Sequence, residues 1–365
     1  MNGKNAKISP AQFMLLMASF IVGSSLLLWF TDNIAKQDAW LVIATAFVVS
    51  IPFILSYAFL AKRFPGKSLI QISDIIYGPV LGKLISILYI SYFLFLLSLN
   101  MLDLADFYMG FIMPETPTLV FLTVFGIICA YAVRKGIETI ARISVFSLIY
   151  AFIVVAVTFL LLLGNIDLDN FLPMLQLSVK DYIQSTHIVA AIPFCEVAVF
   201  LMVFPSLNTT KKAGKYTMGG FAVAAFTLLL ISVRDTAVLG PSAAIYSSAA
   251  YAAARLINIG EVLTRIEILV ALGITVTLFI KVCVLFYASV TSVEQLFRVR
   301  SSSRLIVPIG IIAVVIAMSL FDSIIAHREN GALYHAIYAL PFEFIIPPLS
   351  LLIAKIRKLP KTTAQ

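Results

Sequence analysis

Long apolar runs separated by short polar segments dominate the sequence. A helix needs about 20 consecutive apolar residues to cross the hydrocarbon core of a bilayer, and most of these runs reach that length. The pattern predicts an all-α polytopic membrane protein with about ten transmembrane helices, which form a single transmembrane domain over residues 1–365. The predicted spans are 12–30, 39–60, 82–111, 117–133, 141–163, 186–204, 217–239, 262–294, 305–321 and 335–354.

Basic residues gather on one side of the predicted membrane. When the N-terminus is placed inside, the outer segments hold few Lys or Arg and are rich in Asp instead, such as Asp167 and Asp169. Inner loops of membrane proteins carry the excess of Lys and Arg. We therefore expect a multi-pass cell-membrane protein with cytoplasmic N- and C-termini. The inner segments contain Lys62, Arg63, Lys67, Lys83, Arg134, Lys135, Arg142, Lys211, Lys212, Lys215, Arg298, Arg300, Arg304, Lys355, Arg357, Lys358 and Lys361.

Composition changes this picture little. The chain is 61% hydrophobic and only 12% charged, whereas soluble proteins carry roughly 25% charged residues. The net charge of +8 is explained by the topology signals, so we expect membrane lipid and no nucleic acid as a partner. The three cysteines have no CxxC spacing, and no enzyme motif is present. The sequence thus predicts no metal, no cofactor and no enzyme activity.

The outer link at 164–185 divides the ten spans into five and five. An odd number of spans in each half forces the halves into opposite orientations, which is the condition for an inverted-repeat transporter fold. The predicted half-repeats cover about residues 10–163 and 186–356.

The first helix of each half is expected to break near the midplane. Span one has glycine and serines at its middle, and span six has Pro193, which lacks an N–H and cannot continue a helix. A broken helix offers a positive half-helix N-terminus and free carbonyls, which together suit a zwitterion. In the alternative, the glycine only permits close helix packing and the proline only kinks the helix. The predicted ligand-binding residues at the breaks are Gly23, Ser24, Ser25, Ala191, Ile192 and Phe194, with Phe194 as the aromatic cover.

Polar side chains inside spans are the other candidates. Glu196 and Lys281 lie near the middle of spans six and eight. Charges at that depth are costly, so they form either an ion pair that locks the bundle or a substrate or proton site. Asn100, Asp103 and Asp106 share one face of span three. Asn100 and Asp103 are candidate ligand-binding residues. In the alternative, this face is only the solvated end of the span. We give no chemical role to the histidines, which are assigned to the ends of spans or to loops: His187, His327 and His335.

A resemblance to a known family rests on four stretches in order along the chain. They are ISPAQFMLLMASFIVGSSLL at 8–27, DLDNFLPML at 167–175, FPSLNTTKKAGKYT at 204–217 and RIEILVALGITVTLFIKVCVLFYASVTSVEQLF at 265–297. Together they resemble the B subunits of bacterial spore nutrient-germinant receptors. The resemblance implies partnership with an A subunit and a lipoprotein C subunit in the spore inner membrane, where the complex senses a small nutrient such as an amino acid.

The same family is similar to the amino acid–polyamine–organocation (APC) transporters. This implies a LeuT-like five-plus-five fold with broken helices one and six. The alternative function is therefore a proton-coupled amino-acid permease of that superfamily. Related permeases usually carry Gly-x-Gly where this chain has Gly23-Ser24-Ser25. They also commonly place a cation between helices one and eight, so the resemblance predicts that the Lys281 ammonium takes that position near Val22 and Gly23.

The topology makes a labelling prediction. A cysteine introduced at Asp169 should react with an impermeant thiol reagent added outside, and a cysteine at Lys212 should not, because the charge bias places these residues on opposite sides. Labelling of intact cells measures both. The reverse pattern would contradict the orientation.

Overall fold

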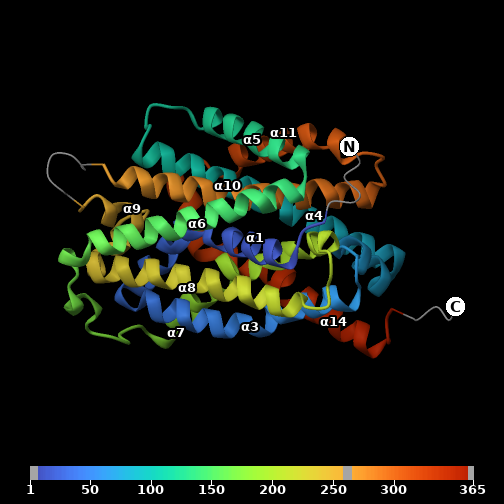
Figure 1. Cartoon of the computed structure of the whole chain (residues 1–365), viewed down its shortest axis with the longest axis horizontal. Helices are drawn as coiled ribbons and strands as arrows, with labels where there is room; N and C mark the ends of the chain where they lie inside the picture. Colours follow the sequence, from blue (N-terminus) through green and yellow to red (C-terminus); the bar gives the residue numbers. More distant parts are fainter. Residues whose placement is uncertain (1–6, 258–264, 361–365) are drawn as a thin grey trace.

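The computed structural model of the chain describes residues 7–257 and 265–360. Most of these residues are helical, and the long helices run roughly along the longest axis of the molecule, with both ends of the chain toward the same end of the bundle (Figure 1). The α-helices are α1 (Pro10–Val22), α2 (Trp29–Ala35), α3 (Ala39–Arg63), α4 (Leu69–Phe111), α5 (Thr118–Lys135), α6 (Ile137–Leu161), α7 (Val179–Val189), α8 (Ala213–Leu239), α9 (Ala249–Ala254), α10 (Glu267–Phe297), α11 (Ile306–Leu320), α12 (Ile324–Asn330), α13 (Ala336–Leu340) and α14 (Ile346–Ile356).

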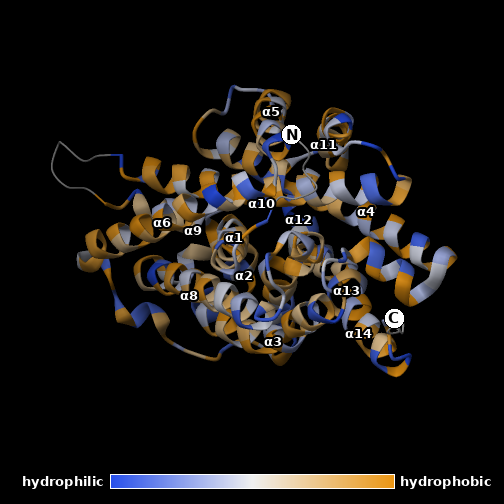
Figure 2. Cartoon of the chain, turned by 45° about the vertical axis from the view of Figure 1, so that its right-hand side comes forward, coloured by the Kyte–Doolittle hydropathy of each residue, from blue (hydrophilic) through white to orange (hydrophobic). Residues whose placement is uncertain are grey.

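The helices confirm the prediction of a polytopic membrane protein. Within the described residues, eight helical stretches are long and apolar enough to cross a membrane, and α1 and α11 are two further, shorter apolar helices. Large apolar side chains remain exposed along the helices, as Val80 (83%) and Phe146 (73%) illustrate. Hydrophobic residues accordingly dominate the long helices in Figure 2, whereas many hydrophilic ones lie in the connecting segments. Lipid is the solvent that such a surface requires.

Both predicted helix breaks are confirmed. Helix α1 ends at Val22 and is followed by a 3₁₀ turn, η2 (Ser25–Leu28), before α2. Helix α7 ends at Val189 and passes into a π turn, η6 (Ala190–Phe194). There Ile192 has φ −114° and ψ 107°, outside the helical region. The residue before a proline is biased away from helical geometry, so Pro193 explains this second break. A 3₁₀ helix, η7 (Cys195–Met202), then continues the span.

Two span boundaries differ most from the prediction. Helix α4 begins at Leu69 rather than at 82 and bends at Gly78 (φ 85°), next to Pro79. The last span begins at Ile324 rather than at 335, so the polar stretch His327–Asn330 lies within a helix. This span is interrupted by two π turns, η11 (Gly331–His335) and η12 (Pro341–Ile345). Residues 262–264 of predicted span eight lie outside the described residues.

Helix α1 occupies the centre of the bundle and packs against α6, α8 and α10. Ile8, just before α1, pairs with Leu207 through a short β-bridge. Between spans seven and eight, a 3₁₀ turn, η9 (Gly240–Ile245), is followed by the short helix α9. Tyr251 of α9 packs against Phe107 and Phe111 at the end of α4. The start of the break after α1 is accordingly buried, with Val22 2% and Ser24 0% exposed.

Close packing of α1 on α8 depends on Gly220. A Cβ atom at this residue would lie 2.6 Å from the Met14 carbonyl oxygen, so a side chain forces the helices apart. Overpacking of this kind costs about 1–3 kcal/mol. Gly220→Ala should therefore lower the melting temperature of the detergent-solubilised protein. Gly214→Ala is the matched control, because Gly214 has open space around it. Equal melting temperatures would contradict the packing described here.

Candidate functional site

The centre of the site is a buried ion pair beside the first helix break. Lys281 on α10 is 0% exposed and pairs with Glu196 on η7, which is 1% exposed. The Lys281 ammonium also donates a hydrogen bond to the Ser24 hydroxyl, at the end of α1. Its Nζ atom lies 5.5 Å from the centre of the Phe20 ring. One ammonium thus connects the breaks in both halves of the fold.

Gly23 allows this arrangement. A Cβ atom there would lie 2.7 Å from the Thr277 carbonyl oxygen and 3.0 Å from the Lys281 Cβ. Only a residue without a side chain lets the break approach α10 this closely. Of the two roles considered for Lys281, the geometry includes elements of both: the ammonium is paired with Glu196 and also stands next to the break in α1.

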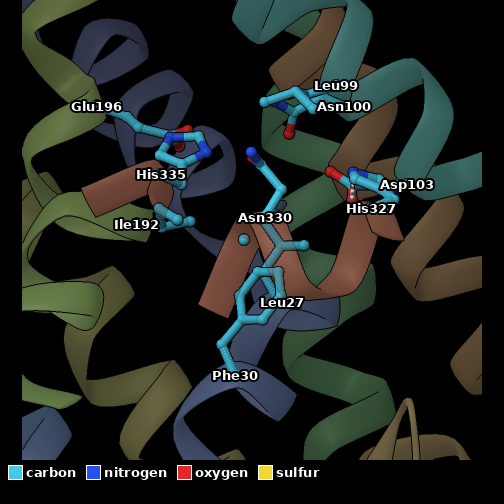
Figure 3. A pocket seen from close by; sticks show the side chains of 11 residues that line it. Leu27, Phe30, Leu99, Asn100, Asp103, Ile192, Glu196, His327, Asn330 and His335 are labelled. Atoms are coloured by element: carbon cyan, nitrogen blue, oxygen red, sulfur yellow. Dashed lines mark ion pairs between the residues drawn. The ribbon is translucent and has the colours of Figure 1, made fainter. Parts of the chain in front are cut away.

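A small polar cavity lies on the other side of Glu196. Its volume is about 10 Å³, which is room for about one water molecule, so an amino acid fits only when the surrounding helices move apart. Figure 3 shows the lining side chains converging from η2 and α2, α4, the span-six break and the last span. The lining residues are Leu27, Phe30, Leu99, Asn100, Asp103, Ile192, Glu196, His327, Asn330, Gly331 and His335.

Three polar atoms of this lining have neither a hydrogen-bond partner nor an ion-pair partner within the described part of the chain. They are Asn100 Oδ1, Glu196 Oε1 and His335 Nε2, and all three are buried. A buried polar group without a partner costs about 1–3 kcal/mol. Their convergence on one small cavity indicates a site for a polar molecule that would satisfy them.

His327 ties the last span to α4 at one edge of the cavity. Its Nδ1 lies 2.8 Å from the Asp106 carboxylate, and its Nε2 lies 3.5 Å from the Asp103 carboxylate. Its ring stacks on Phe321 at 4.8 Å. The face of Asn100, Asp103 and Asp106 predicted from their spacing therefore contacts protein and cavity rather than open solvent. His327 and His335, which the sequence analysis placed on either side of the last outer loop without a chemical role, are buried functional candidates.

The predicted site residues divide into groups. Asn100, Asp103, Ile192 and Glu196 line the cavity. Gly23, Ser24 and Lys281 lie behind Glu196, and Ser25 instead lines a second, mostly apolar cavity that also contains Arg234. Ala191 and Phe194 are fully buried, and Phe194 packs edge-on against Phe221 of α8. Phe194 therefore does not cover the cavity in this conformation, and contact of these residues with a ligand stays a prediction.

Glu343 is the most important residue that the sequence analysis missed. It is fully buried in η12, and its Oε1 accepts a 2.7 Å hydrogen bond from the Tyr92 hydroxyl. Its backbone carbonyl accepts another, 2.6 Å long, from Tyr57. Pro347, four residues later, has no N–H and leaves this carbonyl without its helical donor. The signal was present in the sequence as a single charge in the apolar run PFEFIIPPL.

Arg234 is a second missed charge. It lies within predicted span seven, where it was given no role, and it is 2% exposed within α8 and pairs with Asp235. It also donates a hydrogen bond to Thr158 of α6. This pair lies apart from the cavity next to Glu196.

Comparison with known proteins identifies the family. A family model described as "Spore germination protein" matches residues 7–323, so the chain belongs to the spore germination protein family. It is 26% identical over 360 residues to spore germination protein KB of Bacillus subtilis (strain 168), covering 97% of this chain and 96% of that one. Spore germination protein A2 of the same organism is 23% identical over 220 residues, 60% of each chain. The resemblance inferred from the four stretches is confirmed.

Solved structures confirm the fold. The transporter Mhp1 in a closed conformation with bromovinylhydantoin bound superposes with a TM-score of 0.68 at 14% identity, covering 98% of this chain and 81% of that one. MhsT in complex with L-phenylalanine also has a TM-score of 0.68, at 11% identity, covering 96% and 99%. The LeuT-like fold implied by the family resemblance is thus the fold observed.

The ion pair predicts a specific pattern of stability. Lys281→Met leaves Glu196 buried without its counter-charge, which typically costs about 3–5 kcal/mol. We expect low abundance in the membrane and a lower melting temperature, and substantial recovery in the double variant Lys281→Met/Glu196→Gln. Lys83→Met is the control, because Lys83 is exposed. If the double variant is no more stable than the single one, the pairing energy is not what holds these helices.

Proposed function

We propose that the chain is the B subunit of a spore nutrient-germinant receptor, which binds an amino acid or similar small nutrient in the cavity beside Glu196 and so initiates germination. In this proposal it acts with an A subunit and a lipoprotein C subunit in the spore inner membrane, has cytoplasmic termini and is not an enzyme. Family membership supports the setting. The single observation that carries the binding role is the convergence of three unpartnered polar atoms in one cavity.

The chemistry of the lining supports a ligand with a cationic donor. Asn100 Oδ1 and the free Glu196 oxygen are acceptors, and Asp103 adds a second carboxylate. Asn330 Oδ1 already accepts from Tyr338, which leaves its amide N–H groups as donors to the cavity. An ammonium suits the acceptors, and a carboxylate suits the amide. MhsT, which shares the fold, was solved with an amino acid, L-phenylalanine.

Transport and sensing need the same cavity, so uptake distinguishes them. The full chain in proteoliposomes should show no saturable accumulation of labelled amino acids if it is a receptor subunit. Robust accumulation would favour the alternative, a proton-coupled amino-acid permease.

Asn100→Leu tests the cavity directly. The substitution keeps the size of the side chain but removes the acceptor, and a hydrogen bond to a charged group contributes about 1.5–3 kcal/mol. Spores carrying it should need roughly tenfold or more nutrient for half-maximal germination, at normal subunit abundance. Asn33→Leu is the control, because Asn33 is exposed on α2 and away from the cavity lining. An unchanged dose response in Asn100→Leu would remove the cavity from the proposal.

A further inference from the structure

Glu343 is a buried carboxyl group that forms no ion pair with any of the residues that the structure describes. It is 0% exposed, and its Oε2 atom has no hydrogen-bond partner within the described residues. The groups that face it are hydroxyls and a thiol from three elements, together with the charges of the central pair. They are Tyr57 on α3, Tyr89 and Tyr92 on α4, Cys195 and Glu196 on η7, and Lys281 on α10.

The arrangement places two carboxyl groups near one ammonium. Lys281 contacts Glu196 directly, and the charges of both act on Glu343. The turn η12, which carries Glu343, packs against η7, which carries Glu196. If both acids were ionised, the cluster would hold one net negative charge inside the bundle. An uncompensated carboxylate in such surroundings is so costly that it takes up a proton instead.

We propose that Glu343 holds one exchangeable proton, and that Glu196 and Glu343 share Lys281 as their only counter-ion within this cluster. With Glu196 ionised, Glu343 is the neutral acid. When the negative charge at Glu196 is lost, the O–H bond of Glu343 breaks, the electron pair stays on its carboxylate and the proton leaves to water. Lys281 then pairs with Glu343.

The position of Glu196 links this proton to the cavity. Glu196 lines the cavity, whereas Glu343 does not. A cationic ligand group beside Glu196 adds a second positive charge, which would favour ionisation of Glu343 and release of its proton. This coupling rests on the proposed function, but the proton site itself does not. Glu343 also lies in a π turn, η12, and π turns within helices often mark functional positions.

Infrared spectroscopy of the purified full-length chain, without nutrient, tests the proton site. At neutral pH the wild-type protein should show a protonated-carboxyl band that Glu343→Gln removes and that shifts in deuterated water. Glu115→Gln, in an exposed loop, should leave the band intact. Tyr92→Phe assigns the band to Glu343 in a second way, because the Glu343 carboxyl group is retained. Because this variant loses the hydrogen bond to Glu343 Oε1, the band should move to higher frequency without losing intensity.

The variant Glu196→Gln tests whether the two carboxyl groups share Lys281 as their counter-ion. In Glu196→Gln the ammonium needs a new counter-ion, so Glu343 should ionise and its band should disappear. A spectrum unchanged by Glu343→Gln would overturn the proton site. A Glu343 band that persists in Glu196→Gln would overturn the shared counter-ion. Neither outcome depends on nutrient binding, so failure here is distinguishable from failure of the proposed function.

Discussion

The Lys281 ammonium is the interaction on which the rest of the structure depends. A charge at the centre of a membrane bundle is tolerated only with partners at hand. Lys281 finds them in two places, the Glu196 carboxylate after the second helix break and the Ser24 hydroxyl at the first. One side chain on α10 therefore fixes both breaks relative to each other. Broken helices have free backbone groups that need such fixed partners, because no water is present in the bilayer core to satisfy them.

The last span also depends on polar partners for its irregular backbone. Pro347 leaves the Glu343 carbonyl without its helical N–H donor, and the Tyr57 hydroxyl donates to it instead; the Tyr89 hydroxyl likewise donates to the Phe342 carbonyl. His327 joins the other end of the span to the carboxylates of α4. These polar contacts hold an irregular helix at the edge of the cavity. The irregularity is what brings Asn330 and His335 to the cavity and Glu343 close to the central pair.

Much of the fold could be predicted from the sequence, because its causes are local. The lengths of the apolar runs predicted the spans. Pro193 and the group Gly23-Ser24-Ser25 predicted the two helix breaks. Glu196 and Lys281 stood out because each is a single charge in an apolar run. The site was predicted less well. His327 and Asn330 belong to a polar stretch that looks like a loop, and only pairing with α4 lets it lie in a helix. The position of Phe194 depends on a ring contact with Phe221 on another helix, which no local pattern reveals.

The account joins a transporter fold, a small polar cavity and membership of the spore germination protein family in one central claim: the nutrient binds beside Glu196. A structure of the intact receptor purified with its germinating nutrient at saturating concentration tests this claim most directly. The account predicts ligand density in contact with Asn100, Glu196 and His335. Density in the second cavity, against Ser25 and Arg234, with the first cavity empty, would contradict it.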